Sequence, residues 1–296
     1  MKQGLTRILV WLGIMALLTV IAMGLWMAVS GGSQSTVSLK WLQLLQTVAT
    51  FLLPGILGAW FWSEDHKPFR WLKMDRSVSW QTALSAIAVM LCAIPAINLL
   101  ADLNSRIQLP ESLDFIEQIL RQQEEAAAAL TERFLQADNI WILLINIGLM
   151  ALLPALAEET CFRGTLQQII AGDNHPGTGA RVHIAIWLSA FIFSAIHMQF
   201  YGFIPRMLLG AMFGYALVWT GSLWVPILMH FTNNGMAVMA YYITQRTASA
   251  PDETSIMDTI GTGDTWWTGV ISIIATIALL GLIYQQTKKT KQNETM

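Results

Sequence analysis

The chain has 296 residues, of which 54% are hydrophobic and 12% are charged, and its mean hydropathy is +0.51. Ordinary soluble domains carry about 25% charged residues, so this composition excludes a soluble globular domain. A formal net charge of −2 gives no indication of a nucleic-acid partner. The two cysteines, Cys92 and Cys161, both lie in apolar runs, which excludes a disulfide framework and a CxxC site.

Apolar runs recur along the whole chain, and a helix needs about 20 such residues to cross the hydrocarbon core of a bilayer. This repetition predicts an all-α fold, a polytopic membrane bundle with about eight transmembrane helices. We expect residues 1–296 to form a single membrane domain embedded in the lipid bilayer. The expected spans are about 8–29, 41–62, 82–100, 140–170, 182–198, 207–219, 223–243 and 266–284.

One long polar insert, about residues 104–138, separates the third and fourth expected spans. Leu113, Ile116 and Leu120 have helical spacing, and strong helix formers follow them. The pattern predicts an acidic amphipathic helix or helix pair. Such an insert could cap the bundle, or it could gate access of a substrate.

The distribution of positive charge predicts the orientation in the membrane. With the N-terminus inside and eight spans, most of the 17 Lys and Arg residues fall in cytoplasmic segments. The positive-inside rule then places both termini in the cytoplasm and the polar insert outside it.

Three ionisable residues, Glu158, Glu159 and Arg163, lie within six residues of an apolar stretch. A charge at the centre of a membrane costs about 2.5–3.5 kcal/mol on the gentler scales. Glu159 and Arg163 are four residues apart and can pair on one helix face. Glu158 would then remain an uncompensated carboxylate, which suits a general base. Alternatively, the cluster is a buried ion pair that only fixes packing.

Two further polar groups lie in later spans. His197 follows Phe193 by four residues near the end of the fifth span, and His230 and Asn234 share a face of the seventh. A single buried histidine or asparagine often serves only as a hydrogen-bonding partner between helices. His230 and Asn234 could also donate together to one oxyanion, or help to bind a metal ion.

Taken together, these residues favour a hydrolase, because ionisable groups within membranes usually face one interior cavity. Glu158 would take a proton from water, His197 would hold that water, and His230 with Asn234 would stabilise the oxyanion. This mechanism needs no cofactor. The competing mechanism uses one divalent metal such as zinc, bound by Glu158, His197 and His230, although the HExxH spacing is absent.

The order of the motifs EExxxR, FxxxH and HxxxN resembles that of the CAAX-protease and bacteriocin-processing family (CPBP, also called Abi) of intramembrane endopeptidases. Here they stand as Glu158–Gly164, Phe193–His197 and His230–Asn234 within a motif-bearing core at about 140–245. The resemblance implies that Glu158 is the catalytic base and that Glu159 and Arg163 support it. It further implies that His197 positions water, and that His230 and Asn234 form the oxyanion hole.

The resemblance also implies a substrate and a location. The substrate would be a membrane-associated or lipidated protein or peptide, and we expect a multi-pass protein of the bacterial inner membrane. A non-catalytic immunity or scaffold protein and a proton or solute transporter are the alternatives. No internal repeat is visible in the sequence, which counts against a transporter.

One geometrical condition must be met. The expected limits place His197 near the outer end of the fifth span, whereas His230 would lie about 10 Å into the seventh from the inside. For a shared site, the fifth helix must be tilted, shifted or re-entrant.

Overall fold

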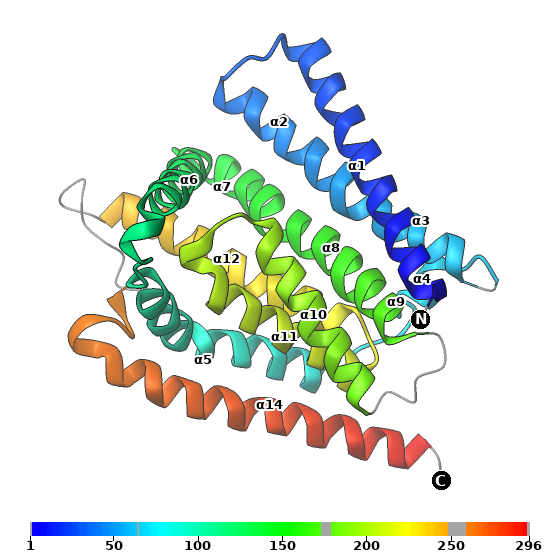
Figure 1. The fold of residues 1–296 in the computed structure, drawn as a ribbon. Coiled ribbons are helices and arrows are strands. Elements are labelled where there is room, and N and C mark those ends of the chain that lie inside the picture. The colour runs from blue at the N-terminus through cyan, green and yellow to red at the C-terminus, as the bar shows by residue number, and fades with distance from the viewer. Residues whose placement is uncertain (1, 64, 173–178, 248–258, 295–296) are drawn as a thin grey trace.

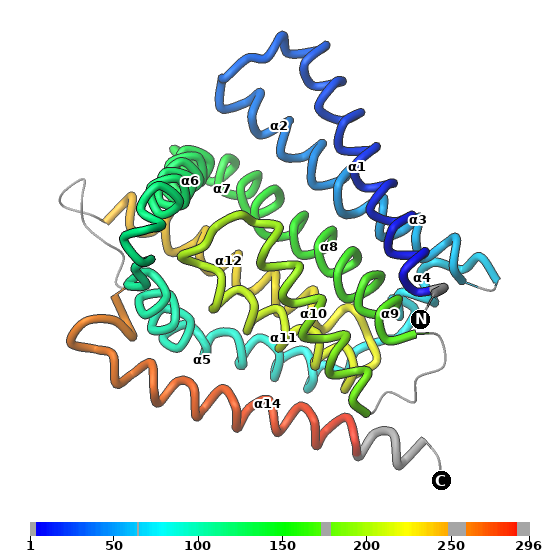
Figure 2. Tube along the Cα trace, viewed as in Figure 1, coloured from blue at the N-terminus to red at the C-terminus, as the bar shows by residue number. Residues whose placement is uncertain are grey.

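The structure is a computed structural model that describes the chain apart from residues 1, 64, 173–178, 248–258 and 295–296. Every regular element among the described residues is a helix, which confirms the all-α prediction. Figure 2 shows the helices as a bundle, with α1 and α14 on opposite sides of it.

The first half of the chain forms two long helical rods, a third long helix and the insert. The elements are α1 (Lys2–Ser30), α2 (Thr36–Thr47), the π-helix η1 (Val48–Leu52), α3 (Leu53–Trp62), α4 (Pro68–Trp71), α5 (Trp80–Ser105), the 3₁₀-helix η2 (Glu111–Leu113) and α6 (Asp114–Leu135).

The second half contains all three motifs. The elements are α7 (Ile140–Asn146), η3 (Ile147–Leu152), α8 (Leu153–Glu159), η4 (Thr160–Leu166), α9 (Gln167–Ala171), α10 (Ala180–Ile196), η5 (Phe200–Gly202), α11 (Phe203–Thr220), α12 (Trp224–Thr247), η6 (Gly263–Thr265) and α14 (Trp266–Glu294).

Among the described residues, six helices are long and apolar enough to cross a membrane. They are Gly4–Ser30, Thr36–Trp62, Trp80–Ser105, Ile140–Ala171, Phe200–Thr220 and Gly263–Lys288. The protein is therefore a polytopic membrane bundle. The number eight is not confirmed, because α10 is a shorter apolar helix and α12 is not among the six.

The helices pack in two groups around the motif-bearing core. In Figure 1, α1 forms a hairpin with the rod of α2, η1 and α3, and α14 lies along α5 on the opposite side. The turn of the hairpin contains Gly31 and Gly32, both with positive φ, a conformation that glycine adopts without steric cost. Between the two groups lie α12 and the α10–α11 hairpin.

The fourth expected span is one continuous rod from α7 to α9, as predicted, and it contains two π-helical segments. One of them, η3, comes directly before Pro154. Proline has no N–H to donate to the carbonyl four residues earlier, which is that of Met150. The second, η4, begins directly after Glu159 and contains Arg163. Wide helical turns of this kind are frequent at functional sites.

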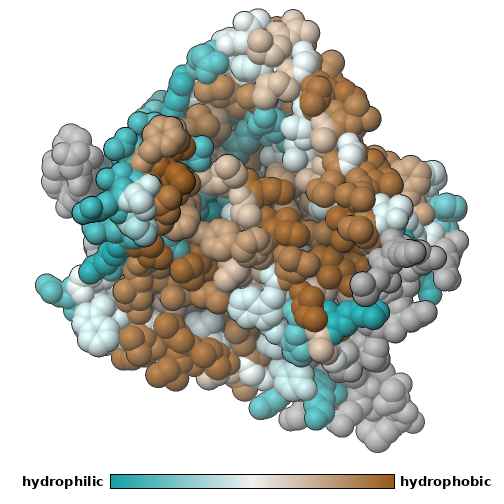
Figure 3. All heavy atoms as spheres, viewed as in Figure 1, coloured by the Kyte–Doolittle hydropathy of each residue, from teal (hydrophilic) through white to brown (hydrophobic). Residues whose placement is uncertain are grey.

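The polar insert is mainly one helix, α6, preceded by the short η2. Figure 3 shows hydrophilic residues gathered over α6 and hydrophobic residues over much of the rest of this face. Glu117 accepts a hydrogen bond from the backbone N–H of Leu109 at 2.8 Å and pairs with Arg121 at 2.7 Å. These contacts keep the pKa of the Glu117 carboxyl below its usual value.

The end of α6 is joined to the membrane bundle by Asn146. Its Nδ2 donates to the carbonyl of Leu135 at 3.0 Å, and its Oδ1 accepts from Lys40 Nζ at 2.6 Å. Asn146 is fully buried, and a buried polar group that loses its partner costs about 1–3 kcal/mol. One amide therefore links α6, α7 and α2.

We expect Asn146→Leu to lower the free energy of unfolding by about 1–3 kcal/mol, because it removes the partner of Lys40 and of the Leu135 carbonyl. Thermal unfolding in detergent micelles measures the effect. The matched control is Ile145→Leu at the exposed neighbouring position, which should leave stability nearly unchanged. Equal stability of the two variants would contradict the linking role of Asn146.

Candidate active site

The centre of the polar cluster is the buried carboxylate of Glu159. Its Oε1 accepts from Arg163 Nη1 at 2.9 Å and from His230 Nδ1 at 2.8 Å. The side chains of Glu159 and Arg163 are fully buried. The pairing predicted from the i, i+4 spacing is therefore present, and it extends to a third residue on α12.

Aromatic rings enclose the cation of this pair. The guanidinium of Arg163 lies 4.3 Å from the ring centroid of Phe193 and 5.4 Å from that of Phe213. Cations are attracted to the faces of aromatic rings, and more strongly where water is excluded. Phe193 is the first residue of the FxxxH motif, so one function of that phenylalanine is to cover the ion pair.

The contacts of His230 fix the direction of its ring. The ring stacks on Phe213 with a centroid distance of 5.5 Å and an interplanar angle of 22°. A carboxylate only accepts hydrogen bonds, so Nδ1 carries a hydrogen and donates it to Glu159. Nε2 lies 3.9 Å from Glu158 Oε2. His230 thus lies between the two glutamates and is hydrogen-bonded to Glu159.

The candidate residues meet at a cavity of about 250 Å³. It is lined by Glu158 from α8, by His197 from the end of α10, and by His230, Asn233 and Asn234 from α12. Glu158 is 12% exposed, whereas Glu159 is fully buried, so the first glutamate is the one that a ligand can reach. The structure brings Glu158, His197, His230 and Asn234 together, while Glu159 and Arg163 lie behind them.

The geometrical condition on the fifth helix is met, because His197 and His230 line the same cavity. Helix α10 has 17 residues and ends at Ile196, fewer than the roughly 20 needed to cross the hydrocarbon. His197 therefore lies where the chain turns back into α11. The helix begins and ends two residues earlier than the expected span of about 182–198. Residues after Ile196, among them His197 and Arg206, line the cavity.

His197 and Asn234 are oriented by backbone carbonyls. His197 Nδ1 donates to the carbonyl of Phe193 at 2.8 Å, which leaves Nε2 with a lone pair in the neutral ring. Asn234 Nδ2 donates to the carbonyl of Met150 at 3.3 Å, and its Oδ1 accepts from Asn233 at 3.1 Å. The Met150 carbonyl is the one to which Pro154 cannot donate.

The metal-binding alternative rests on Glu158, His197 and His230. Among the described residues, no group of three or more His, Cys, Asp or Glu side chains is arranged to hold a metal ion. Glu158, His197 and His230 line one cavity, but they are not placed as a three-ligand set.

Sequence reasoning missed Arg206, which lines the same cavity from the first turn of α11. In the charge count it is only one positive residue of an outer segment. The position of Arg206 next to an apolar helix could have identified it as a candidate, because ionisable residues at membrane depth are costly and usually functional.

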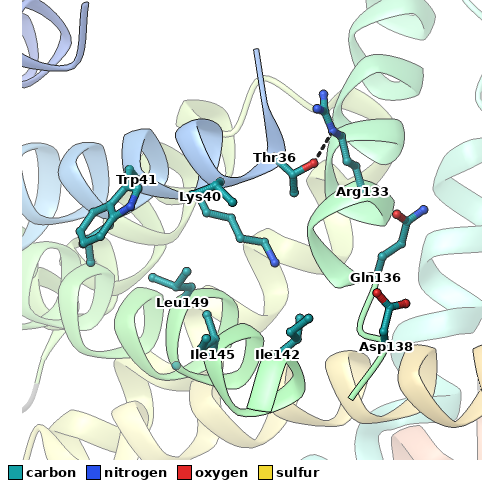
Figure 4. A pocket seen from close by; sticks show the side chains of 12 residues that line it. Thr36, Lys40, Trp41, Arg133, Gln136, Asp138, Ile142, Ile145 and Leu149 are labelled. Carbon is teal, nitrogen blue, oxygen red and sulfur yellow. Dashed lines mark hydrogen bonds between the residues drawn. The ribbon is translucent and has the colours of Figure 1, made fainter. Parts of the chain in front are cut away.

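A second and larger pocket, of about 640 Å³, lies between α2, the end of α6 and α7. Figure 4 shows Trp41, Ile142, Ile145 and Leu149 around it, with Arg133 donating to Thr36 at its edge. This apolar pocket shares no lining residue with the polar cavity. It belongs to the surface between helices rather than to the candidate active site.

Comparison with known proteins agrees with the motif assignment. Residues 139–236 match the family model described as type II CAAX prenyl endopeptidase Rce1-like. This segment runs from the start of α7 into α12 and contains every candidate residue. The resemblance predicted from the three motifs is confirmed over this part of the chain.

A similar protein is the uncharacterized protein YpbD of Bacillus subtilis (strain 168), which is 33% identical over 90 residues. The matched stretch spans 29% of this chain and 40% of that relative. No solved structure matches the chain.

We expect Gly210→Ala to disturb the ion pair. A Cβ at this position of α11 would lie 2.8 Å from Arg163 Nη2 and 3.2 Å from both Ala190 and Phe193. Overpacking of this kind costs about 1–3 kcal/mol, which thermal unfolding in detergent can measure. The control is Gly281→Ala on α14, where a Cβ meets nothing within 4 Å. A Gly210→Ala variant as stable as this control would show that the contact is not tight.

Proposed function

We propose that this protein is an intramembrane endopeptidase that hydrolyses a peptide bond with water activated by Glu158. The observation that carries the proposal is the single cavity lined by Glu158, His197, His230 and Asn234, which come from three separate helices. The match of residues 139–236 to a prenyl endopeptidase family supports it.

Glu158 is the general base. Its carboxylate is partly exposed to the cavity, and the positive charge of Arg163 is already taken up by Glu159. A water molecule in the cavity gives one proton to Glu158 as its oxygen attacks the carbonyl carbon of the substrate. The same proton then goes to the nitrogen of the leaving amine as the C–N bond breaks, which leaves a carboxylic acid and a free amine.

His197 positions the attacking water. With Nδ1–H donated to the carbonyl of Phe193, the lone pair on Nε2 of the neutral ring accepts the second hydrogen of the water. The water is thereby held with one hydrogen toward Glu158 and the other toward His197, and a lone pair remains for the attack. Positioning of this kind lowers the entropic part of the barrier.

His230 and Asn234 stabilise the oxyanion. Asn234 uses one hydrogen of its Nδ2 on Met150 and has the second for the substrate. His230 can donate from Nε2 only as the imidazolium, because its Nδ1–H is bound to Glu159. Donors fixed before the reaction act strongly where water is excluded.

The proposed substrate is a membrane-associated or lipidated protein or peptide, because the cavity belongs to a bundle embedded in lipid. We place the protein in the cell membrane of a bacterium with both termini in the cytoplasm and α6 outside. A non-catalytic scaffold with the same fold is the alternative to be tested.

We expect Glu158→Gln to lower kcat by about 10²–10⁴-fold, the usual contribution of a general base. The assay uses purified protein in detergent and a pool of lipidated peptides, with peptide ends identified by mass spectrometry. Glu132→Gln on the exposed face of α6 is the matched control and should retain full activity.

The same assay with a strong chelator separates the two mechanisms. Activity that withstands the chelator agrees with direct activation of water by Glu158. Loss of activity that a divalent ion restores would replace it with the metal mechanism. Equal cleavage by wild type and Glu158→Gln would eliminate this glutamate as the base.

We expect Asn234→Ala to lower kcat by about 10²–10³-fold with little change in KM, because an oxyanion donor acts mainly in the transition state. Steady-state kinetics on the same peptides provides this separation. Thermal unfolding checks that losing the bond to Met150 has not disrupted the fold. A rise in KM with unchanged kcat would instead indicate a role in binding the ground state.

A further inference from the structure

We propose that Arg206 forms a binding subsite for a carboxylate of the substrate, next to the catalytic groups. This inference rests on the proposed peptidase function and adds the chemical class of the group that the substrate presents. Arg206 belongs to none of the three motifs, and the structure places it on the wall of the cavity that contains Glu158 and His230.

The guanidinium of Arg206 is held in place but not fully used. Its Nη2 donates to Gln199 Oε1 at 2.6 Å. Its Nη1 is buried and has no hydrogen-bond partner. A buried donor without a partner is destabilising, and more so when the group is charged. The guanidinium on the cavity wall is therefore satisfied only in part by Gln199.

The missing partner has the chemistry of an anion. Among the described residues, the guanidinium donates to the neutral amide of Gln199, and no carboxylate is recorded as its partner. The acids that act on Arg206 electrostatically, Glu124 and Glu158, do so from a longer range. A carboxylate matches the fork of an arginine and forms short, charge-assisted hydrogen bonds with it.

The surroundings fix where the guanidinium lies. Arg206 follows the turn after His197, and Gly202 in this turn packs against it: a Cβ there would come 3.0 Å from Arg206 Nη2. The turn is held from two other helices. Asn104 of α5 donates to the carbonyl of Phe200 at 2.9 Å, and Glu124 of α6 accepts from the N–H of Tyr201 at 3.3 Å. Arg206 is therefore attached to a fixed wall.

The size of the cavity limits the distance between the carboxylate and the scissile bond. A volume of about 250 Å³ is below the roughly 300–1,000 Å³ of typical ligand pockets. The carboxylate bound by Arg206 thus belongs to a residue close to the bond that is cleaved. It is either the C-terminal carboxylate of the substrate or the side chain of an aspartate or glutamate.

The experiment compares three pools of N-myristoylated hexapeptides that are otherwise randomised. The first pool has free C-terminal acids and no acidic side chains, the second has C-terminal amides and no acidic side chains, and the third has amides with one glutamate. Cleavage is measured with wild type, Arg206→Gln, Arg206→Lys and the control Arg246→Gln. Arg246 lies at the far end of α12, with its Nη2 bound to the carbonyl of Asp138.

We expect wild type and Arg246→Gln to cleave one carboxylate-bearing pool about 10–100-fold better in kcat/KM than the uncharged amides, as expected for a charged hydrogen bond. In Arg206→Gln this preference should fall to about threefold or less, and Arg206→Lys should restore part of it. A preference for the first pool identifies the C-terminal carboxylate, and a preference for the third identifies an acidic side chain.

Three results would overturn the proposal. They are a wild type that does not distinguish the pools, an Arg206→Gln variant that keeps the preference, and an Arg206→Gln variant that loses activity equally toward all pools. The last result would mean a structural or catalytic role.

Binding of the same pools to Glu158→Gln, followed by the fluorescence of a dye on the peptides, tests the subsite without catalysis. Discrimination in binding that Arg206→Gln abolishes would support the subsite even if no pool were cleaved. In that case the peptidase proposal would fail, and the proposal of a carboxylate subsite would stand. Cleavage without discrimination in binding or rate would leave the peptidase standing and reject the subsite.

Discussion

The buried carboxylate of Glu159 is the constraint on which the rest of the site depends. A charge inside a membrane bundle must be paired, and here one oxygen accepts from both Arg163 and His230. Because these partners belong to different helices, pairing fixes the rod of α8 and η4 against α12. The aromatic rings of Phe193 and Phe213 then close around the pair from α10 and α11. The carboxylate next to it in sequence, Glu158, is left facing the cavity.

This division of labour between adjacent residues follows from helix geometry. Neighbours in a helix lie about 100° apart, so a residue that points into the packed interior places the next one on another face. Glu159 carries the structural charges and Glu158 the accessible one. Two carboxylates that look equivalent in the sequence thus have different surroundings, and only Glu158 faces the cavity.

Much of this arrangement could be predicted from the sequence. The apolar runs predicted a polytopic helical bundle, the i, i+4 spacing predicted the pair of Glu159 and Arg163, and the three motifs predicted which polar residues share a cavity. These features depend on local periodicity and on the cost of charge in lipid, which a sequence displays directly. The contact between Glu159 and His230, 71 residues apart, was not predicted, because it depends on how two helices pack.

The remaining misses have the same origin. How His197 comes to meet His230 was not predicted, since an apolar run shows its composition but not the depth at which the chain turns back. Arg206 was missed because counting charges by loop assigned it to the outer surface, although it lines the cavity beside the motifs. Both errors concern the turn between α10 and α11, where tertiary contacts from Asn104 and Glu124 decide the path of the chain.

Pro154 has a consequence for how this protein tolerates change. It withholds a backbone N–H from the Met150 carbonyl, the group to which Asn234 donates. Replacing it with a good helix former would normally strengthen a helix by about 3 kcal/mol. Here the added N–H would share that carbonyl with Asn234 and weaken the bond that orients the amide. Replacing Pro154 would therefore make the helix itself more stable but would orient Asn234 less well. Stability and activity should respond in opposite directions.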